Sequence, residues 1–284
     1  MLTFIFFAVY FLQLVNLLAE ELPTPVISEL IADVSKIKPG ETFRIGVRFR
    51  IQPNWHIYWK NPGDSGLPTS VNFVVPDGFI AGNLRWPIPM IFKRPGDIED
   101  FGYEGTLLLF SEVTAPSDLS NYETIPIKAE AKWISCSDIC IPGKSDLEIS
   151  SLPTEAEAQI NRSLFEEWEK RLPVDYDAGT SPFIALIEGG IKSDQTDSDI
   201  LVSLDWREKP LDVDWIPAPG NELEIDDVQL NRRNDKTDIN FKALVYGGRK
   251  LDSDILESLV LYVDKDGRRN GTVLQIPLQG NLKN

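Results

Sequence analysis

The residues of this chain best suited to chemistry are its two cysteines, Cys136 and Cys140, which have three residues between them. A disulfide requires Cα atoms roughly 4.4–6.8 Å apart, whereas an extended chain of this length would span about 13 Å. The segment must therefore form a tight turn if the two sulfurs are to join. So short a closed loop contributes only about 2 kcal/mol to stability in the loop-closure model.

Three kinds of chemistry fit this spacing. A disulfide that stabilises a fold usually joins distant segments, and this one would constrain little, which favours a redox pair. Two thiolates together with His56, the single histidine of the chain, could instead bind Cu(I), which prefers soft ligands. A minor structural disulfide in a non-enzymatic interaction module is the third alternative. The spacing alone leaves all three open.

Strands must position the pair. Apolar and charged residues alternate from Thr124 to Trp133, which predicts a strand that leads into Cys136. Pro142 and Gly143 are expected to end the segment, and residues 147–152 to begin another short strand. The cysteines should therefore lie at the end of one strand and the start of a turn.

The rest of the first half also has the pattern of short strands. The clearest is residues 43–51, where five apolar residues alternate with Arg44, Gly46, Arg48 and Arg50. Further strands are expected at 27–34, 55–59, 71–75, 84–87 and 107–113, with loops at 61–68 and 95–105. Because no helix is expected before residue 152, residues 20–152 are predicted to form an immunoglobulin-like β-sandwich.

A helix is predicted to follow. Thr154 to Glu157 has the form of a capping box, and apolar residues recur every four positions up to Pro173, so residues 153–173 are read as a linker helix. Residues 174–284 return to strand patterns, at 183–187, 200–206, 223–230, 239–246, 256–263 and 273–278, with a hairpin turn at 264–267. The predicted fold is therefore all-β, with two immunoglobulin-like β-sandwich domains joined by one helix.

Composition limits the possible partners and the compartment. The formal net charge is −16, which disfavours nucleic acid as a partner. Residues 1–19 carry no charge and are mostly apolar, and Glu20 and Glu21 follow at once. This pattern predicts a secretory signal peptide cleaved after Ala19, or else an uncleaved N-terminal anchor. Both place the rest of the chain outside the cytoplasm, where a disulfide can persist.

Four motifs taken together carry a family resemblance: Trp55–Pro68, Trp86-Pro87, Phe101–Gly105, and Trp133–Cys136 with Cys140-Ile141-Pro142. They resemble the periplasmic N-terminal region of DsbD-type thiol:disulfide interchange proteins, and most of all its ScsB-like branch. The motifs cover about residues 30–150, and the second half resembles the second β domain of that branch more weakly.

The resemblance implies an immunoglobulin-like domain whose paired cysteines pass electrons by thiol–disulfide exchange, with no cofactor. In that family a membrane-embedded partner domain reduces the cysteines, which then reduce periplasmic thioredoxin-fold proteins. Since this chain ends without a membrane or thioredoxin domain, its electron donor is expected to be a separate membrane protein. By the same resemblance, Cys140 forms the mixed disulfide with the downstream partner and Cys136 resolves it.

The resemblance also implies a cap over the cysteines. Glu99-Asp100-Phe101 matches the acidic–aromatic cap of that family by position and composition, with Phe101 as the shielding ring. His56 is expected either near the pair, where it could move protons, or as a packed structural residue. Tyr58 and Tyr103 have the same two readings. The acidic chain, including Asp138 between the cysteines, would raise the thiol pKa unless a partner supplies a positive field.

Overall fold

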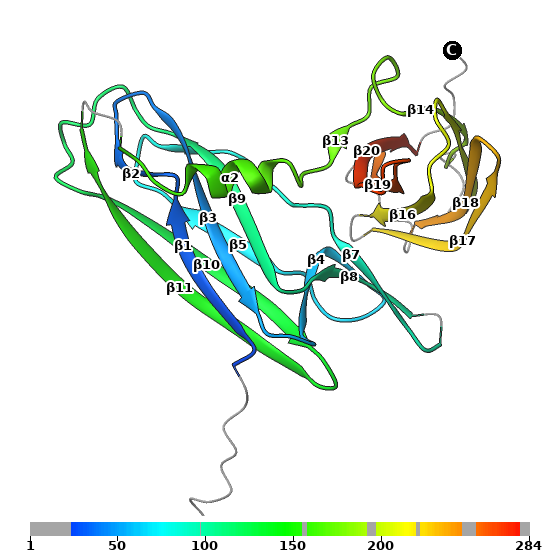
Figure 1. Ribbon diagram of the computed structural model, residues 1–284, viewed down its shortest axis with the longest axis horizontal. Coiled ribbons are helices and arrows are strands. Elements are labelled where there is room, and N and C mark those ends of the chain that lie inside the picture. Colours follow the sequence, from blue (N-terminus) through cyan, green and yellow to red (C-terminus); the bar gives the residue numbers. More distant parts are fainter. Residues whose placement is uncertain are drawn as a thin grey trace, which may run out of the picture.

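The computed structural model describes residues 24–96, 98–154, 158–191, 197–219, 222–245 and 254–278. They form two β-sandwiches that lie side by side along the long axis of the molecule, with the helix α2 (Arg162–Glu169) between them in the chain (Figure 1). The predicted fold, two β-sandwiches joined by a helix, is confirmed. The predicted signal peptide, residues 1–19, lies outside the described residues.

The first sandwich contains the cysteines and has two sheets. One sheet has the order β1-β3-β9-β6, with bounds β1 Val26–Ala32, β3 Thr42–Ile51, β9 Thr106–Thr114 and β6 Ile80–Ala81. The other has the order β12-β2-β11-β10-β4-β8-β7, with β5 paired to β10. Its bounds are β2 Val34–Ile37, β4 His56–Gly63, β5 Ser70–Val74, β7 Met90–Arg94, β8 Ile98–Tyr103, β10 Ile125–Cys136, β11 Cys140–Pro153 and β12 Ala158–Gln159.

Strand β3 explains why these residues form a sandwich. Its apolar residues are buried in the core, and its arginines lie on the other face, as the period of two predicts. There Arg44 forms an ion pair with Asp33, 2.8 Å away, and Arg48 and Arg50 both pair with Glu29. The strand therefore separates apolar and charged side chains between the core and the surface.

Strand β11 is longer than predicted. It begins at Cys140 and runs through Pro142 and Gly143 without a break, paired along its length with β10. Pro142 is tolerated because β2 pairs only with Leu152 and Pro153, so β11 is an edge strand at Pro142. Gly143 is required because a Cβ there would lie 2.2 Å from the indole of Trp133, its cross-strand partner.

Three other segments differ from the predictions. The expected loop at 95–105 is mostly the hairpin of β7 and β8, and β4 extends into the expected loop at 61–68. The expected strand at 84–87 is reduced to a single bridge between Arg85 and Phe110. Glycine and proline suggested loops in the first two segments, whereas pairing with neighbouring strands ordered them.

The helix begins later than predicted. It starts at Arg162, after Asn161, which has a left-handed backbone (φ 51°) and donates a side-chain hydrogen bond to Ala32 O at 3.0 Å. That bond ties the chain to the first sandwich and so sets the helix start. Phe165 and Trp168 are buried against the same sandwich. The residues of the expected capping box at 155–157 lie outside the described residues.

The second sandwich also has two sheets. One has the order β13-β20-β19-β16, with bounds β13 Val174–Asp175, β20 Arg269–Pro277, β19 Ile255–Val263 and β16 Asp212–Ala218. The other has the order β14-β15-β18-β17, with bounds β14 Phe183–Gly189, β15 Asp197–Trp206, β18 Lys236–Val245 and β17 Leu223–Arg233. The predicted hairpin turn at 264–267 is present between β19 and β20. Strand β16 was not predicted.

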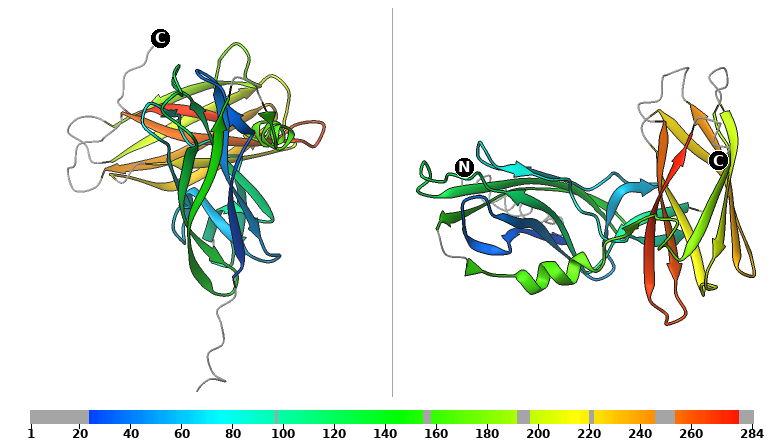
Figure 2. Two further views of the ribbon diagram at one scale, coloured as in Figure 1. Left: turned by 90° about the vertical axis from the view of Figure 1, so that its left-hand side faces the viewer. Right: turned by 90° about the horizontal axis from the view of Figure 1, so that it is seen from above.

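The two sandwiches are in contact. In Figure 2, seen from above, the strands of the second sandwich run across those of the first. Lys60 forms an ion pair with Glu257, and Asn61 Nδ2 donates to Pro217 O. No helix among the described residues is long and apolar enough to cross a membrane.

Candidate functional site

The cysteines form a disulfide at the end of the β10–β11 hairpin. Cys136 and Cys140 are direct partners in the strand register, with Cα atoms 4.2 Å apart. Between them, residues 137–139 make a tight turn in which Ser137 N donates to Ile139 O at 3.0 Å. Ser135 Oγ adds a hydrogen bond to Ile141 O at 3.0 Å. The expectation that the segment folds back tightly is confirmed.

The two cysteines differ in exposure. Cys136 is 0% exposed, whereas Cys140 is an exposed residue. Ile139, beside Cys140 in the turn, is 52% exposed. An incoming thiol can therefore reach the disulfide from the Cys140 end, whereas protein covers the Cys136 end.

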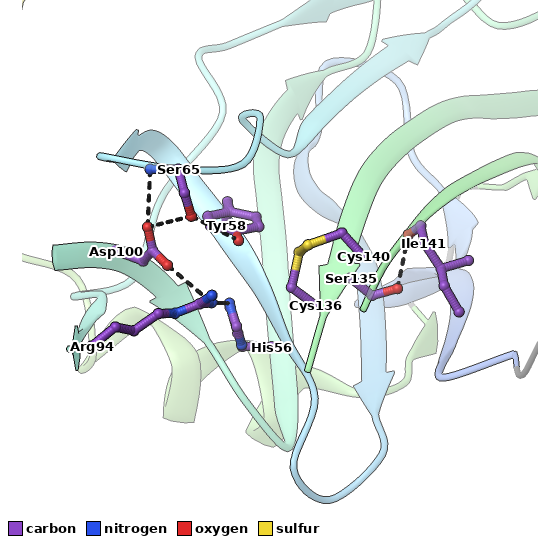
Figure 3. Close-up of a disulfide and its surroundings, with 9 residues drawn as sticks. All are labelled: His56, Tyr58, Ser65, Arg94, Asp100, Ser135, Cys136, Cys140 and Ile141. Carbon is purple, nitrogen blue, oxygen red and sulfur yellow. Dashed lines mark hydrogen bonds and ion pairs between the residues drawn. A yellow bond between two sulfur atoms is a disulfide. The ribbon is translucent and has the colours of Figure 1, made fainter. Parts of the chain in front are cut away.

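The strand register brings a polar network to the same face of the sheet as Cys136. Cys136 pairs with His56 in β4, and Tyr58 pairs with Gly102 in β8. Directly paired residues of a sheet point to the same face, and so do alternate residues of one strand. The same rule places three further side chains of the β7–β8 hairpin on the cysteine face: Phe92, Arg94 and Asp100. Figure 3 shows the disulfide with most of these side chains.

His56 lies in the middle of this network. Its ring stacks on Phe92, with centroids 4.7 Å apart, and meets Tyr58 edge-on at 5.2 Å. Arg94 Nη2 lies 3.0 Å from His56 Nε2. An arginine can only donate, so Nε2 is the acceptor and the imidazole proton is on Nδ1. Burial, reinforced by Arg94 and opposed by Asp100, lowers the pKa of His56, so the ring is neutral near pH 7.

Asp100 holds the arginine in place. It is 0% exposed, and its Oδ2 forms an ion pair with Arg94 Nη2 at 2.9 Å. Its Oδ1 accepts hydrogen bonds from Ser65 N at 3.0 Å and Ser65 Oγ at 2.7 Å. The loop of Ser65 also covers Tyr58, since a Cβ at Gly66 would lie 2.2 Å from the Tyr58 ring. The carboxylate is thus both paired and hydrogen-bonded, as a buried charge requires.

Three predicted site residues lie on the opposite face of β8. Glu99, Phe101 and Tyr103 alternate with Asp100 and Gly102, so they point away from the face of Cys136. Phe101 is 7% exposed and lines a cavity shared with Trp215 and Pro217 of the second sandwich.

The other two also have partners away from the disulfide. Tyr103 Oη donates to Pro87 O at 2.7 Å, and burial raises the pKa of Tyr103 well above its ordinary value. Glu99 forms an ion pair with Lys93 at 3.0 Å. The structure therefore brings His56, Tyr58 and Asp100 to the cysteine face but not Glu99, Phe101 or Tyr103.

Sequence reasoning missed Phe92 and Arg94. Both faces of residues 90–94 mix apolar and charged side chains, so this segment carries no period-two pattern that could have shown which residues face the cysteines. Among the described residues, no group of three or more His, Cys, Asp or Glu could hold a metal ion.

These features define a class: a two-sandwich protein with one disulfide that solvent reaches from one side. Residues 26–151 match the family model described as "Thiol:disulfide interchange protein DsbD, N-terminal". This part of the chain is thus similar to the N-terminal region of DsbD-type proteins, and the predicted resemblance to that region is confirmed.

A solved structure has the same two-sandwich fold. The crystal structure of the N-terminal periplasmic domain of ScsB from Proteus mirabilis aligns with 91% of this chain and 95% of that chain, with a TM-score of 0.63 and 17% identity. This likeness shows the fold of both sandwiches. A protein of unknown function from Porphyromonas gingivalis W83 aligns with 89% of this chain at 8% identity and a TM-score of 0.24, which carries no argument. No curated protein matches the sequence.

Proposed function

We propose that the Cys136–Cys140 pair relays electrons by thiol–disulfide exchange with thioredoxin-fold proteins. The observation that carries the proposal is the asymmetry of the pair, with Cys140 exposed and Cys136 buried. Exchange proceeds by attack of a thiolate on one disulfide sulfur, so one cysteine must be reachable and the other must act from within the protein.

The steps assign one role to each cysteine. In the reduced protein, the Cys140 thiolate attacks a disulfide of the acceptor, and one acceptor sulfur leaves as a thiolate. Cys136 then attacks the Cys140 sulfur, re-forms the Cys136–Cys140 disulfide and releases the acceptor as a dithiol. The acceptor gains two electrons, and this pair is oxidised. A dithiol donor restores the pair by the reverse sequence.

The packing supports a chemical role for the disulfide over a structural one. The β10–β11 register extends from Ile125 opposite Ser151 to Cys136 opposite Cys140. The cross-link therefore closes a turn that the hairpin already fixes. Its contribution to stability is limited to about 2 kcal/mol, which leaves it free to open without loss of the fold.

We also propose a compartment and an electron donor from the family match. A DsbD-type N-terminal domain suggests an extracytoplasmic location, where the oxidised pair persists. We assign the electron supply to a membrane protein and the electron demand to a soluble thioredoxin-fold protein.

The β7–β8 hairpin takes the place of the predicted cap in this proposal. Phe92 stacks on His56 on the cysteine face and replaces Phe101 as the ring beside the site. Asp100 keeps a role through its ion pair with Arg94. Copper binding is less well supported, because Arg94 occupies His56 Nε2.

The reduction potential of the pair tests the proposal. The protein from Glu20 onward is equilibrated in graded glutathione buffers, alkylated and weighed. A potential between about −270 and −180 mV supports a relay, because working exchange proteins lie in that range. A value below about −300 mV marks a structural cross-link and overturns the proposal.

Trapping tests the assignment of the two cysteines. Cys136→Ser is expected to accumulate a mixed disulfide between Cys140 and a thioredoxin-fold acceptor. The matched variant Cys140→Ser is expected to accumulate none, because Cys136 is covered. The reverse pattern would exchange the two roles.

A further inference from the structure

Opening the disulfide creates a charge at a buried position. When an incoming thiolate attacks Cys140, the S–S bond breaks and the Cys136 sulfur leaves as a thiolate. Cys136 is 0% exposed, so water cannot solvate this anion. An unpaired charge in such a place is costly, and a cation or hydrogen-bond donor is needed to stabilise it.

The lysines nearest in the hairpin are already paired. Lys132 and Lys144 both lie against Glu130, at 3.0 and 3.2 Å, and Lys144 also pairs with Asp146 at 3.3 Å. The turn itself adds the acidic Asp138. The hairpin that carries the cysteines therefore supplies no free positive charge among these residues.

Arg94, in another hairpin, acts on the cysteine face through His56. It lies on the face of the sheet that carries Cys136, and its guanidinium contacts the imidazole of His56, the register partner of Cys136. Asp100 and Ser65 fix the guanidinium from the other side, through the ion pair at 2.9 Å and the hydrogen bonds to Asp100. The side chain is therefore held in one position instead of moving freely in solvent.

The contact with Arg94 also fixes which ring nitrogen of His56 carries the proton. Because Nε2 accepts a hydrogen bond from Arg94, the imidazole keeps its proton on Nδ1 and has a single N–H to donate. The charged and titratable groups around the ring are Arg94 and Asp100 of the β7–β8 hairpin, Tyr58 of its own strand and Cys136 of β10.

We propose that Arg94 is a positioning residue for the exchange reaction. It fixes His56 in the form protonated at Nδ1, and this N–H stabilises the Cys136 thiolate that forms when the disulfide opens. The inference rests on the proposed function and adds to it an internal hydrogen-bond donor for the buried thiolate.

The ionisation of Cys136 tests the proposal. In a Cys140→Ser background, the thiolate of Cys136 is followed by its absorbance at 240 nm as the pH is raised. Arg94→Gln is expected to raise the midpoint by about one pH unit, which corresponds to tenfold less thiolate. Arg94→Lys is expected to recover part of the shift, because the lysine ammonium group can still donate to His56 Nε2. An unchanged midpoint in Arg94→Gln overturns the proposal.

Two further variants separate this effect from a general change of structure. Arg85→Gln removes an exposed arginine outside the network and is expected to leave the midpoint unchanged. His56→Phe keeps an aromatic ring against Phe92 but removes the N–H, and it is expected to raise the midpoint as Arg94→Gln does. If Arg94→Gln fails to fold, an unchanged midpoint in His56→Phe overturns the proposal.

The potential of the intact pair gives an independent readout. In the two-cysteine protein, Arg94→Gln is expected to shift the equilibrium with glutathione about tenfold towards the disulfide, which is about 30 mV for a two-electron couple. If the wild-type pair proves unable to exchange with a thioredoxin-fold protein while the Cys136 midpoint still depends on Arg94, the proposed function fails and the role of Arg94 in ionisation stands. If exchange is normal and the midpoint does not move, only the present inference fails.

Discussion

Two hairpins of this molecule, β19–β20 and β10–β11, close their short turns in different ways. The β19–β20 turn is held by the Asp264 carboxylate, which accepts hydrogen bonds from Asp266 N at 3.0 Å, Arg268 N at 2.8 Å and Asn270 Nδ2 at 3.2 Å. Gly267 supplies the positive φ, 78°, that the turn requires. The bonds that hold this turn closed are local hydrogen bonds.

The β10–β11 turn has a cross-link in place of such a carboxylate. Asp138 lies in the turn, but the hydrogen bonds that close it run from Ser137 N to Ile139 O and from Ser135 Oγ to Ile141 O. The covalent bond between the cysteines is the feature that the other hairpin lacks. The hydrogen bonds of Asp264 do not depend on the redox state of the compartment. A disulfide persists only under oxidising conditions and can be opened by a thiol of another protein. The β19–β20 turn is thus held permanently by local hydrogen bonds, whereas the disulfide of the β10–β11 turn can be opened by exchange.

The largest expected effect comes from removing the cross-link. Cys140→Ser is expected to abolish exchange with a thioredoxin-fold substrate, because the reachable sulfur is lost. The same change is expected to lower the free energy of unfolding by no more than about 2 kcal/mol. Reduction of an oxidised thioredoxin-fold protein, followed by alkylation, and urea unfolding measure the two effects.

The matched change in the other hairpin is Asp264→Ala. It is expected to lower the stability of the second sandwich and leave exchange unchanged. If Cys140→Ser unfolds the first sandwich, the disulfide is structural and the contrast between the two hairpins fails.

A smaller effect is expected at Gly143, which lies in the β10–β11 hairpin opposite Trp133. A Cβ there would meet the indole of Trp133, and Trp133 packs edge-on against Phe49 with centroids 5.4 Å apart. Gly143→Ala is therefore expected to destabilise the first sandwich by about 1–3 kcal/mol through overpacking. Urea unfolding followed by tryptophan fluorescence measures the loss. Ser150→Ala, at an exposed position of the same strand, is the control, and an equal loss in both variants would contradict the explanation.

The smallest effect is a pH dependence from His56. Burial lowers its folded-state pKa below 6.5, so between the two pKa values the folded protein binds fewer protons than the unfolded chain. Its contribution to stability is therefore present above about pH 6.5 and is lost as the pH falls through the folded-state pKa. The wild type is expected to lose more stability than His56→Gln in this window. Parallel curves for the two proteins, measured by urea unfolding, would contradict the sign.

Local patterns in the sequence were sufficient for much of the fold. The alternation in β3 depends on one face being apolar, and this information lies within ten residues. The turn at 264–267 was likewise predictable from its own residues. Strand β16 was missed because Pro217 argues against a strand, yet β16 is at the edge of its sheet, where a missing N–H is tolerated.

The site was only partly predictable, because it depends on pairing between distant strands. The cysteines and His56 were found from their residue types. Which residues share their face depends on the register of β4 with β10 and β8, and a slip of one residue would move every side chain to the other face. Phe101 has the composition expected of a cap, whereas the register places Phe92 and Arg94 on the cysteine face. Residue types alone cannot determine that register.

The register of β10 with β11 also has a kinetic consequence. The pairs from Ile125 opposite Ser151 up to the cysteines do not depend on the sulfur–sulfur bond, so Cys136 stays opposite Cys140 after reduction. In the proposed relay, Cys136 therefore attacks the mixed disulfide between Cys140 and the acceptor as an intramolecular group at high effective concentration. The acceptor is expected to be released before a second molecule can intervene, so that electrons leave this protein two at a time.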